Sequence, residues 1–293
     1  MSVLGVIVCY HPDGDILKRI DVLSEQCDFL VVYDNSEHVN TSIASHVFNK
    51  SNVELISNGE NVGIATALNY AVTKAMLDGY KYLLSSDQDT DFEHNYVCRM
   101  LSVLEENEGV RLLAPLYFDK NRGKNASFPV RKGCFAIRND LSRCASLQKV
   151  FAAITSGMIY DVSVFEELGG FIDDYFIDYV DNEFCLRAVS NNIDVFVSPD
   201  IVVRHALGDR TSIAGISPTN YSPLRKYYMT RNRFDVYKKY FVKFPFFVFY
   251  DFLAFGWDLA RIVLFESDKS LKLKYVVYAL KDFVFNKMGK FSR

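Results

Sequence analysis

The sequence predicts an α/β protein in which helices flank a mostly parallel central sheet, with a helical extension at the C-terminus. Three observations favour this fold class. Short apolar runs alternate with helical patterns through the first half of the chain, which is typical of βαβ units. Several of these runs end directly in carboxylates or other polar residues, as strands do at the ligand-binding edge of an open sheet. Beyond about Ser222 the patterns are helical only.

The first half contains the clearest elements. We predict strands at Val3–Tyr10, Phe29–Tyr33, Val53–Ile56, Tyr80–Ser85 and Arg111–Ala114. We predict helices at Ile16–Cys27, Ile64–Leu77 and Phe92–Leu104. The second helix is the most regular, because its apolar residues recur along one stripe with the helical period.

The middle of the chain is less regular. Residues Leu116–Val150 have weak periodicity and are expected to form loops and hairpins that carry part of a site. We then expect a strand at Phe151–Tyr160, a short helix at Asp161–Leu168 that ends at two glycines, a helix at Asp181–Asn191, and one or two strands within Ile193–Val203. The predicted domains are a nucleotide-binding and catalytic domain, 1–215, and a helical region, 216–293.

Composition excludes some classes of function. The net charge is −3 and the pI is about 6.0, so nothing favours nucleic-acid binding. The six cysteines are scattered without a C-x-x-C pair, which indicates reduced thiols rather than a disulfide framework or a zinc site. The N-terminus lacks a basic segment before its apolar run, so no signal peptide is predicted. We therefore expect a cytoplasmic protein.

The most informative motif follows the fourth predicted strand. Asp87 and Asp89 are separated by one residue, so both side chains point the same way if the segment is extended. Two carboxylates at a strand end suit Mg²⁺ or Mn²⁺, which prefer oxygen ligands and often share them with phosphates. The alternative is a strand that ends in a polar turn, because a two-residue motif is weak by itself.

Three further positions have both a structural and a functional interpretation. Asp34 ends a strand, where it either accepts from a pyrimidine N–H or forms a common Asp-Asn turn. Asn61-Val62-Gly63 precedes the amphipathic helix, where it either caps the helix or presents free N–H groups to a phosphate. His205 follows an apolar run and is either structural or a metal ligand.

A second acidic cluster lies at Asp178-Tyr179-Val180-Asp181-Asn182-Glu183, at the start of a predicted helix. One of its acids could deprotonate an incoming hydroxyl, provided that it lies within hydrogen-bond reach of that proton. Placement of charge at a helix N-terminus is the alternative, and it is sufficient for Glu183.

The motifs occur along the chain in an order that resembles a known enzyme family. They are Tyr10-His11-Pro12, Asp34-Asn35-Ser36, Asn61-Val62-Gly63, Asp87-Gln88-Asp89, Ser156-Gly157, Gly169-Gly170-Phe171, Asp178-Tyr179-Val180-Asp181 and His205. Over nearly its whole length the chain resembles family 2 inverting glycosyltransferases of the GT-A fold, and within them bacterial rhamnosyltransferases. The segments 176–183 and 227–233 are the most specific for that subgroup.

The resemblance implies roles for individual residues. Tyr10, Asp34, Asn61, Gly63, Asp87, Ser156 and Gly157 would bind the nucleotide-sugar. Asp89 and His205 would bind a divalent ion, Mg²⁺ or Mn²⁺. Asp181 would be the catalytic base, because it matches the second acid of the family's Glu-Asp motif. Val180 replaces the first acid, which leaves Asp178 as a competitor for the role of base.

The implied reaction is transfer of L-rhamnose from dTDP-L-rhamnose to a hydroxyl of a cell-surface polysaccharide or a lipid-linked glycan precursor. A UDP-hexose donor, galactose or glucose, is the alternative. A nucleotidyltransferase is less favoured, because 10–14 lacks a glycine- and arginine-rich loop. A binding protein with a dead site is disfavoured by the intact acids.

The C-terminal region is rich in aromatic and basic residues, notably 244–257. Asp251, Asp258 and Arg261 interrupt this segment, which argues against a bilayer span. Three interpretations stay open: a peripheral contact with the inner face of the plasma membrane, which suits a polyprenyl-linked acceptor; a homodimer contact; and packing onto the catalytic domain.

Overall fold

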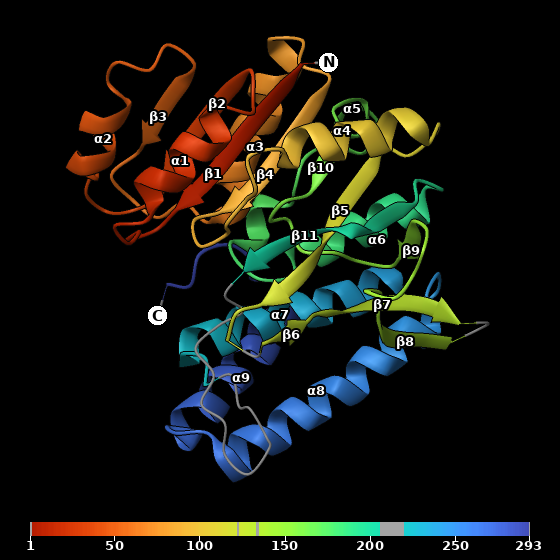
Figure 1. The fold of residues 1–293 in the computed structure, drawn as a ribbon. Coiled ribbons are helices and arrows are strands. Elements are labelled where there is room, and N and C mark those ends of the chain that lie inside the picture. The colour runs from red at the N-terminus through yellow and green to blue at the C-terminus, as the bar shows by residue number, and fades with distance from the viewer. Residues whose placement is uncertain (1, 122, 133–134, 206–219, 293) are drawn as a thin grey trace.

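The structure is a computed structural model that describes residues 2–121, 123–132, 135–205 and 220–292. Within these residues, nine strands form one sheet whose main path runs β3-β2-β1-β4-β10-β5-β11-β9, and β6 pairs with β5 (Figure 1). The strands on this path are β1 (Val3–Cys9), β2 (Phe29–Asp34), β3 (Val53–Ser57), β4 (Tyr82–Asp87), β5 (Leu112–Asp119), β9 (Gln148–Val150), β10 (Ile159–Asp161) and β11 (Val195–His205). The predicted mostly parallel sheet is confirmed, since all pairs on the path are parallel except those of β9 and β10.

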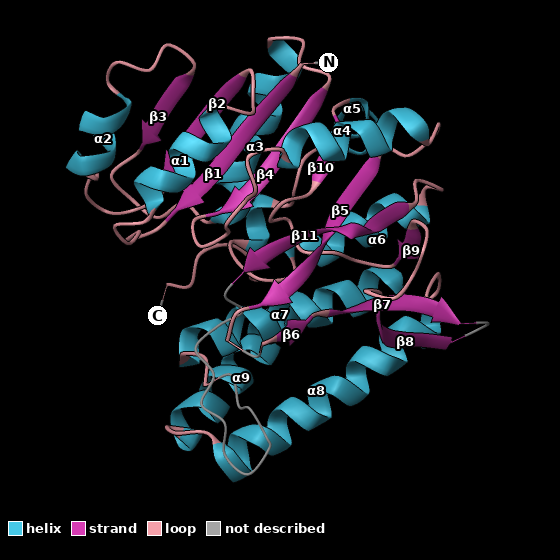
Figure 2. Cartoon of the chain, viewed as in Figure 1, coloured by secondary structure: helices cyan, strands magenta, loops and turns pink. Residues whose placement is uncertain are grey.

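The helices of the first half connect the parallel strands and determine the order of those strands in the sheet. They are α1 (Ile16–Ser24), α2 (Thr41–Val47), α3 (Ile64–Leu77) and α4 (Tyr96–Glu106). The chain steps outward from β1 to β3 and then returns to β4 on the other side of β1. Because parallel crossovers are right-handed, α1 and α3 cover opposite faces of the sheet, as Figure 2 shows. The order of strands therefore reverses between β1 and β4, which is where open α/β sheets bind ligands.

The second half interrupts the parallel pattern. β10 inserts antiparallel between β4 and β5, and a separate hairpin is formed by β7 (Ser127–Lys132) and β8 (Phe135–Asp140). The short β6 (Lys124–Asn125) pairs with β5, so the expected hairpins of the middle region are confirmed. Two short helices follow, α5 (Ser163–Leu168) and the 3₁₀ turn η1 (Asp173–Tyr175), and then α6 (Val180–Ser190).

One predicted strand was too long, and one helix was not predicted. The strand predicted at Phe151–Tyr160 is restricted to β10, because Gly157 has a φ of 79° and the segment before it turns. The helix α2 was not predicted, because it spans only seven residues with little apolar periodicity. The side chain of Asn40 stabilises it by accepting a hydrogen bond from the Ile43 N–H at 3.1 Å.

Three helices follow the last strand, as predicted. They are α7 (Pro223–Tyr240), α8 (Pro245–Phe265) and α9 (Lys269–Val284), and they lie together at the lower end of the view in Figure 1. No helix among the described residues is long and apolar enough to cross a membrane.

The helix α8 buries two acidic side chains beside α7 among apolar ones, and its outer side is apolar. Arg233 of α7 pairs with Asp251 at 3.0 Å and with Asp258 at 3.2 Å, and all three side chains are largely buried. The exposed side chains of α8 are instead apolar: Phe246, Phe249, Phe252, Leu253, Trp257, Val263 and Leu264. Contact of this region with a membrane, a second copy or an acceptor stays a prediction.

Two buried side chains of α7 hold the segment that leads into α6. The Asn232 Nδ2 atom donates to the carbonyls of Tyr175, Ile177 and Asp178 at 2.9 to 3.0 Å. The guanidinium of Arg231 donates to the carbonyls of Asp174 and Gly289. Buried carbonyls need such partners, because an unsatisfied polar group is costly. We refer to residues 174–179 as the acidic loop.

The Asn232→Ala substitution is expected to lower the free energy of unfolding by about 2 to 4 kcal/mol, because it removes the shared donor of three carbonyls. Urea unfolding followed by circular dichroism measures this change. Lys238→Ala, at an exposed position of the same helix, is the matched control and should change stability by less than about 0.5 kcal/mol. Equal effects of the two substitutions would contradict the role of Asn232.

Candidate active site

The carboxyl ends of β1 and β2 are joined by hydrogen bonds. The carboxylate of Asp34 is buried and accepts from the N–H groups of Ser36 at 3.1 Å and Asn40 at 2.8 Å. The Ser36 hydroxyl in turn accepts from the N–H of His11. Asp34 thus orders the loop that follows its own strand, and its predicted contact with a pyrimidine stays a prediction.

Tyr10 lies between three of the predicted motifs. Its N–H donates to Oε1 of Gln88 at 2.6 Å, and its hydroxyl donates to Glu37 at 3.1 Å. Burial and Glu37 raise the pKa of the Tyr10 hydroxyl, whereas a hydrogen bond with Asn61 opposes that rise. The ring is 44% exposed, so a flat ligand group could stack on it.

The turn at Asn61-Val62-Gly63 is tightly built. The N–H of Val62 donates to Asn35, the N–H of Gly63 to the Asn61 side chain, and the N–H of Ile64 to the carbonyl of Phe176. Gly63 has a φ of 90°, and a Cβ atom there would lie 2.7 Å from the Phe176 carbonyl oxygen. Only glycine fits this approach of the acidic loop. Because these three N–H groups already have protein acceptors, positive charge for a phosphate at this turn has to come from elsewhere.

The motif at the end of β4 is held by the Ser156-Gly157 turn. The Ser156 Oγ atom accepts from the N–H of Asp87 at 3.0 Å and lies 2.6 Å from the hydroxyl of Thr90. Behind the motif, Arg19 donates to the carbonyl of Gln88 at 2.9 Å. Two predicted donor-binding motifs, distant along the chain, are therefore in direct contact.

The acidic loop has unusual backbone geometry. Phe176, Asp178 and Tyr179 all have φ values of 62° to 63°, which non-glycine residues rarely adopt. Each such residue costs of order 1 kcal/mol and persists only where its surroundings enforce it. Here Asn232 of α7 provides that constraint. The loop ends at α6, whose first turn carries Asp181.

The two candidate bases differ in their partners. The Asp178 carboxylate is paired with Arg225 at 3.2 Å, whereas Oδ1 of Asp181 accepts from the N–H and the side chain of Asn182 at 2.7 and 3.0 Å. Burial, with a contribution from the negative charges of Asp178 and Asp87, raises the pKa of Asp181 to about 6, against the opposing effect of the hydrogen bonds from Asn182. Burial also raises the pKa of Asp178, although Arg225 opposes it. Asp87 and both acids are therefore close enough to interact electrostatically.

Glu183 has the structural role expected from its position. It is buried and accepts from Arg187 at 2.9 Å and from the hydroxyl of Tyr240 on α7 at 2.8 Å.

Asp87 and Asp89 could supply some of the ligands of a divalent ion, but not a complete set. Asp87 and Asp89 are partly exposed at the end of β4, and one or two carboxylates suffice for Mg²⁺ when phosphates complete its shell. Among the described residues there is no group of three or more His, Cys, Asp or Glu residues that could hold a metal ion. The backbone of His205 ends β11 and pairs with Asp119, but its side chain lies outside the described residues. Metal binding by Asp89 and His205 stays a prediction.

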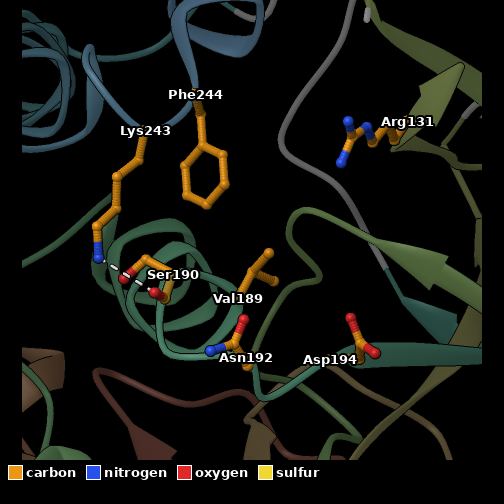
Figure 3. A pocket seen from close by; sticks show the side chains of 7 residues that line it. All are labelled: Arg131, Val189, Ser190, Asn192, Asp194, Lys243 and Phe244. Carbon is orange, nitrogen blue, oxygen red and sulfur yellow. Dashed lines mark hydrogen bonds between the residues drawn. The ribbon is translucent and has the colours of Figure 1, made fainter. Parts of the chain in front are cut away.

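A pocket of about 440 Å³ lies elsewhere, at the C-terminal end of α6 (Figure 3). It is lined by Arg131, Val189, Ser190, Asn192, Asp194, Lys243 and Phe244. Lys243 and Arg131 point toward it from opposite sides, and Lys243 donates to the carbonyl of Ser190 at 3.1 Å. None of the predicted site residues lines it, so it is separate from the acidic cluster at the other end of α6.

Sequence reasoning did not assign several residues to the site. Arg225 lies within electrostatic range of both Asp178 and Asp87. Lys290, near the C-terminal end of the described chain, donates to the carbonyl of Asn61 at 2.9 Å. The only sequence signal for either was the interleaving of basic and aromatic residues after Tyr221, which does not indicate where a side chain lies.

Comparisons with known proteins agree with the resemblance drawn from the motifs. Residues 6–169 match the model of the family described as glycosyl transferase family 2. The dTDP-rhamnosyl transferase RfbF of Shigella flexneri is 32% identical over 243 residues, which cover 81% of this chain and 80% of that protein.

Solved structures share the fold at low sequence identity. S. aureus TarS 1-349 in complex with UDP-GlcNAc aligns with a TM-score of 0.64 and 15% identity, over 97% of this chain and 81% of that chain. GalNAc-T7 with UDP, GalNAc and Mn²⁺ aligns with a TM-score of 0.59 and 17% identity, over 82% of this chain. The present chain spans about half the length of the GalNAc-T7 chain and of a longer TarS chain. The predicted GT-A fold is confirmed.

The raised pKa of Asp181 predicts a pH-dependent effect of Asp181→Asn on stability. The wild-type acid stabilises the fold below its unfolded pKa of about 4, and this contribution is lost as pH rises through about 6. The neutral Asn avoids a buried charge, so the variant should gain about 1 to 3 kcal/mol relative to wild type at pH 8, and much less at pH 4. Denaturant unfolding at both pH values, with exposed Asp200→Asn as control, measures the difference. A difference that does not change with pH would contradict this interpretation.

Proposed function

Because the chain belongs to glycosyl transferase family 2 and is therefore a glycosyltransferase, we propose that it transfers L-rhamnose from dTDP-L-rhamnose. The proposed acceptor is a hydroxyl of a cell-surface polysaccharide or of a polyprenyl-linked glycan precursor. The donor is supported by the 32% identity to a dTDP-rhamnosyl transferase over four-fifths of both chains.

The proposed chemistry is supported by the position of Asp181 in the first turn of α6, where the negative charge of Asp87, at the end of β4, contributes to its raised pKa. A donor bound at the end of β4 would then have its reacting carbon near a carboxylate that can accept a proton. Asp181 suits this role better than Asp178, because Asp178 is already paired with Arg225.

In the proposed reaction, the Asp181 carboxylate accepts the proton of the acceptor hydroxyl as that oxygen attacks the anomeric carbon. The bond from this carbon to the diphosphate breaks, and dTDP leaves with the bonding electron pair. The attack comes from the face opposite the leaving group, so the anomeric configuration inverts and no covalent enzyme intermediate forms. Because the pKa of Asp181 is about 6, its carboxylate is ionised at neutral pH.

Asp89 and His205 are the residues that we propose to hold a divalent ion, with Asp87 beside the ribose or the shell of that ion. A bound Mg²⁺ or Mn²⁺ would supply charge neutralisation for the leaving diphosphate. Asp87 is positioned by Ser156 and the Gln88 carbonyl by Arg19, so both sides of this motif are fixed by the protein.

The alternative donors, UDP-galactose and UDP-glucose, can be compared with dTDP-rhamnose in one binding assay. TarS was solved with UDP-GlcNAc and GalNAc-T7 with UDP, which keeps a UDP-hexose as the alternative. A nucleotidyltransferase would instead consume a nucleoside triphosphate and release pyrophosphate. Thermal shift with Mg²⁺ and dTDP-rhamnose, UDP-galactose or UDP-glucose ranks the donors, because a ligand that binds only the folded state raises its stability.

Asp181→Asn is expected to reduce sugar transfer by at least about 100-fold, because a positioned base contributes that much or more. Binding of the donor should be retained. Turnover with dTDP-rhamnose and an acceptor glycan, together with calorimetric donor binding, separates the two effects. Asp178→Asn is the companion variant. If Asp181→Asn kept near-normal turnover while Asp178→Asn lost it, the base would be Asp178.

Treatment with EDTA is expected to abolish transfer, and added Mg²⁺ or Mn²⁺ should restore it. The Asp89→Asn variant should need a higher metal concentration for half-maximal turnover, because it loses a carboxylate ligand. Glu105→Gln, at an exposed position on α4, serves as the control. Full turnover of the wild-type protein in EDTA would rule out the metal role of Asp89.

A further inference from the structure

Arg225 occupies the first turn of α7, beside the acidic cluster. Its Nε atom lies 3.3 Å from both carboxylate oxygens of Asp178, and its Nη2 atom lies 3.2 Å from Oδ1. The guanidinium also lies over the ring of Tyr221, 4.2 Å from the ring centroid. The Arg225 side chain is 42% exposed, whereas that of Asp178 is 12% exposed. The cation therefore faces solvent with part of its fork while the acid does not.

The contact between the two side chains is looser than a typical ion pair. Charge-assisted N–H···O bonds are usually 2.7 to 2.9 Å long. All three distances here exceed that range, and no hydrogen bond of Nη1 occurs among the described residues. The arginine could thus bind a further anion without giving up tight buried bonds.

The carboxylates near Arg225 give a reason why a bound anion would be stabilised by this residue. Although burial works against the charged form, the carboxylates of Asp178 and Asp87 raise the pKa of Arg225 above its ordinary value. Asp181 also interacts electrostatically with Asp178 and Asp87, so three carboxylates contribute negative charge to this region. This charge would repel a diphosphate, so a cationic side chain, in addition to the proposed divalent ion, would favour its binding.

We propose that Arg225 binds the diphosphate of the nucleotide-sugar, an inference that rests on the function proposed above. On binding, Arg225 would exchange part of its contact with Asp178 for contacts with phosphate oxygens. The planar fork of arginine matches phosphate geometry, which a lysine ammonium matches only as a point charge. The N–H groups of Val62, Gly63 and Ile64 are already paired with protein acceptors, so they do not replace this contact.

The test distinguishes recognition of the diphosphate from recognition of the nucleoside. Calorimetry with Mg²⁺ measures the affinity of dTDP and of thymidine for the wild-type protein, Arg225→Gln, Arg225→Lys and the control Lys238→Gln, at an exposed position on the same helix. We expect Arg225→Gln to weaken dTDP binding roughly 10- to 100-fold and to leave thymidine binding unchanged. Arg225→Lys should be intermediate, and Lys238→Gln should match the wild type. The loss should shrink at high salt.

Unchanged dTDP binding by Arg225→Gln would overturn the role of Arg225 and leave the proposed transferase standing. An equal loss for dTDP and thymidine would also overturn it, because a purely structural role would affect both ligands. A wild-type protein that binds neither dTDP nor UDP would overturn the proposed function itself. If Arg225→Gln fails to fold because Asp178 has lost its partner, the double variant Asp178→Asn/Arg225→Gln removes both charges and allows the same comparison.

Discussion

The contact of Arg231 and Asn232 with the acidic loop is the interaction on which the rest of the site depends. Three non-glycine residues of that loop adopt positive φ values, and several of its carbonyl groups accept hydrogen bonds from α7. Such a backbone is not stable alone, because it combines strain with buried acceptors. One amide and one guanidinium satisfy these acceptors, and the amide itself is oriented by a bond from Nε of Arg231 at 3.1 Å. The direction of the two acids is therefore set by a helix outside the sheet.

A second constraint operates at the sheet edge. The Ser156 hydroxyl binds the backbone of Asp87, and the Phe176 carbonyl binds the start of α3. These contacts link β4 to the turn before β10, and the acidic loop to the turn before α3. The acids are therefore carried by segments that distant parts of the chain hold in place, which is the preorganisation that the proposed acid–base chemistry requires.

Sequence patterns predicted those elements whose structure is determined by residues close together in the chain. Ile64–Leu77 was predicted at its observed limits because one apolar stripe faces the sheet. The polar residues after β1, β2 and β4 were correctly placed at strand ends, because topology brings parallel strand ends together. The roles of Arg225 and Asn232 could not be predicted, since both lie in a helix of low apolar content in which several polar side chains, Asn232 among them, are buried. Burial of such a helix follows from long-range pairing, which no periodicity records.

The tail after α9 returns to the beginning of the fold. Gly289 donates its N–H to the Asp174 carbonyl, and Lys290 reaches Asn61, which is 229 positions earlier. During synthesis on the ribosome, the sheet can collapse as soon as its strands emerge, but the clamp around the acids has to wait for this late segment. Nascent chains would therefore pass through a stage in which the sheet is already compact and the acidic loop still lacks its contacts with the tail.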